Sequence, residues 1–87
     1  MENRSCYGKA FRQLRLDRGY SLKEAAGNII SPQMLGVFEH GKSSISLNNF
    51  GRLLIRIGAT WNDFFRYYNG ESILKELSLS EEIFVKI

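Results

Sequence analysis

Cysteine, proline and long apolar runs are scarce in this chain of 87 residues. Cys6 is the single cysteine, which excludes an internal disulfide framework and a cysteine-based zinc site. No apolar run approaches the roughly 20 residues of a membrane-spanning helix, and the first residues lack the apolar core of a signal peptide. With 44% hydrophobic and 13% aromatic residues, the composition is that of a folded protein. We therefore expect one small domain in the cytoplasm, without contact to a membrane.

The two parts of the chain differ in charge. Residues 1–66 hold ten Lys and Arg against five Asp and Glu, a net charge of +5. Residues 67–87 hold two against four, a net charge of −2. A basic body fits a polyanionic partner such as nucleic acid. Many domains of similar charge bind no anion, so charge alone does not decide between these alternatives.

Capping residues divide the chain into short segments with a helical spacing of apolar residues. Ser21 and Thr60 each precede an acidic residue by three positions, which is the spacing of a capping box. Ser31-Pro32 places a serine cap before a proline at the first helical position, where the missing N–H costs nothing. The segments predicted to be helical are residues 5–18, 22–27, 31–39, 46–57 and 61–68.

One side of each predicted helix is apolar, which indicates a shared core. The residues expected inside the first, third and fourth helices are Tyr7, Ala10, Phe11, Leu14, Leu35, Phe38, Leu47, Phe50, Leu53, Leu54 and Ile57. Strand-like alternation is almost absent. The predicted fold class is all-α, a compact five-helix bundle formed by residues 1–70, followed by a short helical tail at residues 71–87.

The two short helices at residues 22–27 and 31–39 are joined by a tight turn. This layout is that of a helix-turn-helix, whose second helix lies in the major groove of DNA. An ordinary corner between two helices has the same pattern, so the layout alone leaves both open. The third helix has Met34 where a capping-box glutamate could sit. An acid there would repel a DNA phosphate, so its absence favours DNA binding.

At this point the sequence resembles a known family. The segments "QLRLDRGYSLKEAA" and "ISPQMLGVFEHGKSSISLNNFGRLL" are similar to the DNA-binding domain of the XRE (phage-repressor-like) family, and more closely to the N-terminal domain of Rgg/MutR-type transcriptional regulators. The similarity covers about residues 7–70. The positions that match at the same spacing are Ser31, Pro32, Leu35, Phe38, Glu39 and Gly41.

The resemblance implies a five-helix fold of the lambda-repressor-like type, with the second and third helices as the DNA-binding unit. It also implies that Arg15 and Glu39 pair inside the domain. The pair is physically plausible because Glu39 follows the core residue Phe38, and a guanidinium is the bidentate partner that a shielded carboxylate needs. Two solvated surface charges are the alternative.

The sequence departs from the family in the third helix. Gly36-Val37 stands where the family has Ser-Arg, and His40 stands where it has a second arginine. Direct readout is therefore expected from Gln33, as a reader of adenine, and from apolar contacts of Met34 and Val37. The residues expected to contact phosphates are Arg12, Ser21, Ser31, His40, Lys42, Ser43 and Ser44.

No motif indicates an enzyme, a cofactor or a metal site. His40 has no second histidine and no paired cysteine beside it, and we find no carboxylate pair, P-loop or nucleophile motif. The aromatic residues at helical spacing are more typical of a core or an interface than of a base-stacking platform; they are Trp61, Phe64, Phe65, Tyr67 and Tyr68.

The sequence thus predicts a sequence-specific DNA-binding transcriptional regulator, or its isolated N-terminal domain. The alternative is a helix-turn-helix-derived module that binds a related regulator and not DNA. We expect a homodimer through residues 61–87, because the tail is rich in apolar residues; these are Ile73, Leu74, Leu77, Ile83, Phe84, Val85 and Ile87. They could also fold back on Trp61 and Phe65 of their own chain, or begin a missing C-terminal domain.

Overall fold

Five helices and no strands make up residues 3–68, the part of the chain that the computed structural model describes, with side chains from residue 7 onward. Four of them are α1 (Asn3–Asp17), α2 (Leu22–Ala26), α3 (Pro32–Glu39) and α4 (Leu47–Arg56), and the fifth spans residues 61–68. The all-α prediction is confirmed for this region. The predicted tail at residues 71–87, with all of its apolar residues, lies outside the described residues.

Serine and threonine side chains begin four of the five helices. Ser21, Ser31 and Ser46 each accept a hydrogen bond at 3.0 Å from the backbone N–H three residues further on. Thr60 accepts the same bond from Asp63, and the Asp63 carboxylate accepts one at 2.9 Å from the Thr60 N–H. These caps satisfy N–H groups that the helix itself leaves without partners. They explain why the helices begin close to the predicted positions.

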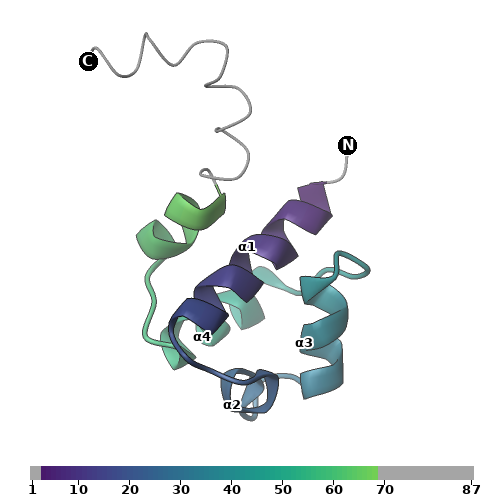
Figure 1. Cartoon of the computed structure of the whole chain (residues 1–87). Coiled ribbons are helices and arrows are strands. Elements are labelled where there is room, and N and C mark those ends of the chain that lie inside the picture. The colour runs from purple at the N-terminus through teal and green to yellow at the C-terminus, as the bar shows by residue number, and fades with distance from the viewer. Residues whose placement is uncertain (1–2, 69–87) are drawn as a thin grey trace, which may run out of the picture.

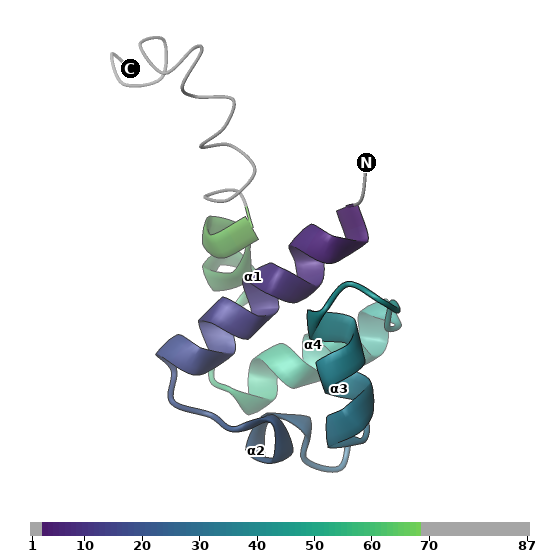
Figure 2. The ribbon, with the colours of Figure 1, turned by 45° about the vertical axis from the view of Figure 1, so that its right-hand side comes forward.

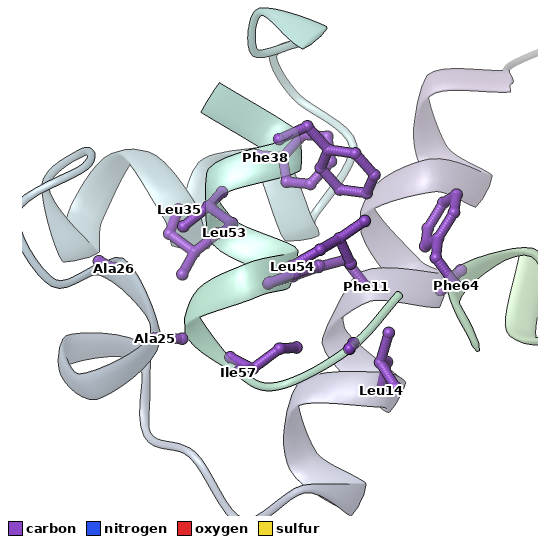
Figure 3. Packing of buried hydrophobic residues seen from close by; sticks show 13 residues of the cluster. Phe11, Leu14, Ala25, Ala26, Leu35, Phe38, Leu53, Leu54, Ile57 and Phe64 are labelled. Carbon is purple, nitrogen blue, oxygen red and sulfur yellow. The ribbon is translucent and has the colours of Figure 1, made fainter. Parts of the chain in front are cut away.

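All five helices contribute to one hydrophobic core. The ring of Phe50 on α4 lies 5.6 Å from that of Phe11, 5.8 Å from that of Phe38 and 4.8 Å from that of Phe64, measured between centroids. Figure 3 shows Phe11, Phe38 and Phe64 together with Leu35 and Leu53 in the space between the helices. Burial of each large side chain contributes about 1.5–3 kcal/mol. The core therefore fixes α3 against α1 and α4.

Two residues predicted to be inside are not buried. Leu47 is 74% exposed, because it is the first residue of α4 and the core contacts of that helix begin one turn later, at Phe50. Tyr7 is 42% exposed, and its ring lies beside that of Tyr68, with 4.9 Å between centroids. The predictions for these two positions were wrong. Helical spacing correctly identifies the side of a helix, but not how far along that side the core extends.

Candidate nucleic-acid interface

The short helices α2 and α3 pack on one another at the edge of the domain. In two views, α3 lies beside α1 and α2 lies at the foot of α3 (Figures 1 and 2). The inner side of α2 consists of Ala25 and Ala26, both fully buried, which lets the helix approach α3 and α4 closely. It ends at Gly27, whose φ of 52° turns the chain toward α3. The sequence therefore builds a compact corner from one small helix and one longer helix.

Helix α3 has two sharply different sides. Leu35, Phe38 and Glu39 are buried against the domain. The exposed side consists of Gln33, Met34, Val37 and the C-terminal capping residue His40, with Met34 45% and Val37 39% exposed. The helix has no acidic residue in its first turn and no basic residue in its last turn. Its outward surface therefore has no Lys, Arg, Asp or Glu side chain, and it is partly apolar.

A buried ion pair ties α3 to α1. The Nε and Nη2 atoms of Arg15 donate to the two carboxylate oxygens of Glu39 at 2.7 and 2.8 Å, and Nη1 donates to the Tyr20 carbonyl at 2.8 Å. The two side chains are 6% and 2% exposed. Arg15 and Glu39 are thus paired as the resemblance implied. With all three guanidinium nitrogens engaged, the orientation of α3 is fixed by directional bonds as well as by apolar packing.

Helices α1 and α3 also touch through their backbones. A Cβ atom built on Gly8 would lie only 2.0 Å from the carbonyl oxygen of Phe38 and 2.9 Å from the Cα of Glu39. Only glycine allows this approach. Sequence reasoning did not single out Gly8, because a glycine within a helix does not reveal whether another backbone lies against it.

The predicted phosphate-contacting residues are not equally accessible. Arg12, Lys42 and Ser44 are exposed. The hydroxyl oxygens of Ser21 and Ser31 accept capping bonds, so each still has a proton to donate. The predicted phosphate contacts of these five residues stay predictions.

His40 and Ser43 are more restricted. The Nδ1 atom of His40 lies 2.8 Å from the Gly36 carbonyl oxygen, which leaves Nε2 for an outside partner. The Ser43 hydroxyl oxygen is buried and has no hydrogen-bond partner among the described residues. In this rotamer it does not face solvent, so the predicted phosphate contact of Ser43 would need the side chain to rotate.

Three basic residues near the α2–α3 corner were missed by sequence reasoning. Arg52 and Arg56 on α4 line a shallow depression with Asn28 of the turn before α3, together with Ile29 and Ile55. Arg56 donates from Nε to the Glu24 carbonyl at 2.8 Å, behind the end of α2. Their positions in the fourth helix were predictable, but only the packing of α4 against α2 places them beside the turn.

Lys23 on α2 is the third missed residue. It is exposed, and it has no hydrogen-bond or ion-pair partner among the described residues. The sequence alone did not single out Lys23, because a basic residue next to the capping acid Glu24 is as typical of a solvated surface as of a ligand contact.

The acidic side chains of residues 7–68 all have hydrogen-bond partners within the domain, whereas several basic side chains have none. All four carboxylates of residues 7–68 accept hydrogen bonds within the domain; they belong to Asp17, Glu24, Glu39 and Asp63. Hydrogen bonds from the backbone and side chain of Ser21 hold the pKa of Glu24 below its ordinary value, with a smaller effect of Arg56. Four exposed cations have no partner among the described residues; they are Arg12, Lys23, Lys42 and Arg52. The charge left for an outside partner is therefore positive.

The described residues contain neither a membrane-crossing helix nor a metal cluster. No helix among residues 3–68 combines the length and apolar composition needed to span a bilayer. Within the same region no three His, Cys, Asp or Glu side chains lie where they could share a metal ion.

Comparison with protein-family models, curated proteins and solved structures finds no significant match to this chain.

Proposed function

We propose that this chain is a sequence-specific DNA-binding transcriptional regulator, or the isolated N-terminal DNA-binding domain of one. In this proposal the fold is of the phage-repressor-like helix-turn-helix type, with α2 and α3 as the unit that binds DNA and α3 in the major groove. The exposed side of α3, which is backed by the buried core residues Leu35 and Phe38, carries the proposal. The resemblance of residues 7–70 to XRE-family regulators supports it.

The dimensions and chemistry of α3 suit this role. An α-helix with its side chains is about 10–12 Å across, and the major groove is about 12 Å wide. Gln33, Met34 and Val37 would face the base edges. Phosphates would be bound by the residues around them, chiefly Arg12 and Lys42, with Arg52 as a further candidate. The Arg15–Glu39 pair contributes by holding α3 at one angle to the rest of the domain.

We further propose that two copies bind together. One α3 covers only a few base pairs, whereas two-fold dimers of this kind place two such helices about 34 Å apart, one turn of DNA. We propose contact through residues 61–87. Of this range, the described part supports the proposal with Trp61 and Phe65, which are 41% and 44% exposed and whose rings are 6.3 Å apart.

A fluorescence anisotropy titration tests the main proposal. The full chain is titrated into a labelled duplex of mixed sequence at about 50 mM and about 200 mM salt, because each neutralised phosphate releases counterions and gives the affinity a steep salt dependence. Lys42→Ala should weaken binding to all sequences alike and reduce the salt slope by about one unit, while Lys42→Arg should retain both. Absent or salt-insensitive binding of the wild-type chain would overturn the proposal.

One observation favours a second function. The exposed side of α3 has no arginine or lysine, and two of its four residues are apolar, as in a surface that binds another protein. A module of this kind would bind a related regulator and no DNA. In the same titration it shows no affinity for duplex at either salt concentration, and Met34→Ala weakens its binding to the regulator.

A further inference from the structure

The base pairs that α3 can recognise are limited by what its exposed side lacks. In the major groove, guanine presents two acceptors, O6 and N7, which are read by the paired donors of arginine or by lysine. The exposed side of α3 offers Gln33, Met34, Val37 and His40 and has neither residue type. Among the described residues, the cations without a partner lie on α1, α2, α4 and the loop after α3, and not on α3 itself. The helix therefore lacks both side-chain types that most commonly read guanine.

The same side chains match an A·T pair. Adenine presents an acceptor and a donor, N7 and N6–H₂, and a glutamine amide supplies the complementary donor and acceptor. Thymine adds a C5-methyl group, which makes apolar contacts. Met34 and Val37, both about two-fifths exposed, lie one turn apart on the helix and form the apolar part of this surface.

We infer that α3 selects A·T base pairs through the major groove, with Gln33 reading adenine and Met34 and Val37 contacting thymine methyl groups. This inference rests on the proposed DNA-binding function and names the class of site that the function would use. The cations on the other elements would bind phosphates without regard to sequence. The exposed side of α3, which has no Lys, Arg, Asp or Glu, would provide the sequence preference.

Base analogues test the inference atom by atom. Sites are first selected from random duplex DNA with the full chain. In the selected duplex, each thymine is then replaced by uracil, which removes only the C5-methyl group. Loss of a contacted methyl group should reduce the affinity about four-fold, the equivalent of one buried methylene group.

Replacement of A·T by inosine·cytosine retains the minor groove of A·T and presents the major groove of G·C. It should cost between about five-fold and about 150-fold at the pair read by Gln33.

Two variants at the exposed Val37 connect the effect to the protein. In Val37→Ala, the loss caused by uracil at the contacted position should disappear, because the methyl no longer has its partner. Val37→Arg should shift the preference at that position toward G·C, since arginine supplies the donors that guanine needs. Both changes are at a solvent-exposed site, and circular dichroism before titration verifies that each variant is folded.

The possible outcomes distinguish A·T selection by α3 from DNA binding as such. Steep salt dependence together with a uracil effect that Val37→Ala removes supports both. Salt-dependent binding that is indifferent to uracil and inosine, or a selected site whose contacted pairs are G·C, overturns A·T selection and leaves DNA binding intact. Tolerance of inosine with loss on G·C substitution would indicate reading through the minor groove and would overturn the major-groove assignment. Failure to bind any duplex overturns the function and the inference together.

Discussion

Two helical glycines have opposite surroundings and should respond oppositely to the same substitution. At Gly8 a Cβ atom would collide with the backbone of α3 at 2.0 Å, and a backbone cannot move aside as a flexible side chain does. At Gly36 the nearest atom to a new Cβ is Leu22 Cδ1 at 3.6 Å, an ordinary contact. The two positions thus form a matched pair in which only the local space differs.

We predict that Gly36→Ala stabilises the domain by up to about 1 kcal/mol, because alanine loses less backbone freedom on folding. That corresponds to a rise in Tm of about 4–8 °C. Gly8→Ala should instead lower Tm, because α1 and α3 must separate. Thermal unfolding followed by circular dichroism measures both. Equal shifts in the two variants would contradict the close approach of α1 and α3 at Gly8.

The pairing of Arg15 with Glu39 allows a second prediction. Arg15→Ala leaves the Glu39 carboxylate buried without its partner, at a cost of about 3–5 kcal/mol, so Tm should fall by more than about 10 °C. The double variant Arg15→Ala/Glu39→Ala should lose less than the sum of the two single variants, since no stranded charge remains. A single variant that melts within a degree or two of wild type would contradict a stabilising pair.

At the scale of elements, Asp63 connects the helix at residues 61–68 to the rest of the domain. Its carboxylate accepts from the Thr60 N–H at 2.9 Å, from Arg18 at 3.2 Å and from Arg66 at 2.7 Å. The backbone and side-chain hydrogen bonds of Thr60 are the main reason that its pKa lies below the ordinary value, followed by the two arginines. Arg18 belongs to the turn after α1, so one carboxylate both caps its own helix and attaches it to α1.

The lowered pKa of Asp63 gives a pH dependence of definite sign. The stabilisation is complete above the ordinary aspartate pKa of about 3.9 and is lost as the pH falls through the lower pKa of the folded state. Asp63→Asn should therefore melt at a lower temperature than wild type at pH 7, and the difference should shrink toward pH 2. Tm measured between pH 2 and pH 7 tests this. Two parallel curves would show that the carboxylate charge contributes nothing.

The whole molecule is expected to associate. Trp61 and Phe65 leave aromatic surface open on the helix that leads to residues 69–87, and the sequence of that segment supplies further apolar side chains. Sedimentation of the full chain at micromolar concentration should show a species of twice 10.0 kDa. Trp61→Glu should shift it toward the monomer, while Met34→Glu, a change on the exposed side of α3, serves as the control. A wild-type chain that sediments as a monomer at every concentration would contradict the predicted dimer.

The sequence by itself determined the helical elements of this protein. Serine and threonine caps are local, since each bonds to an N–H three residues away, so Ser21, Ser31 and Thr60 could be recognised from spacing alone. The all-α class followed from the periodicity of apolar residues. The exposed residues of α3 were predictable for the same reason, because they alternate with Leu35 and Phe38, which had to be buried.

Only the tertiary structure decided which residues from distant parts of the chain meet. The exposure of Leu47, the contact between Gly8 and the α3 backbone, and the position of Arg52 beside the turn at Asn28 all depend on how helices pack. Local spacing carries no information about these distances, because the same helix could rest on its neighbours at several angles. The burial of the Ser43 hydroxyl likewise follows from packing around its loop, and no sequence pattern could have indicated it.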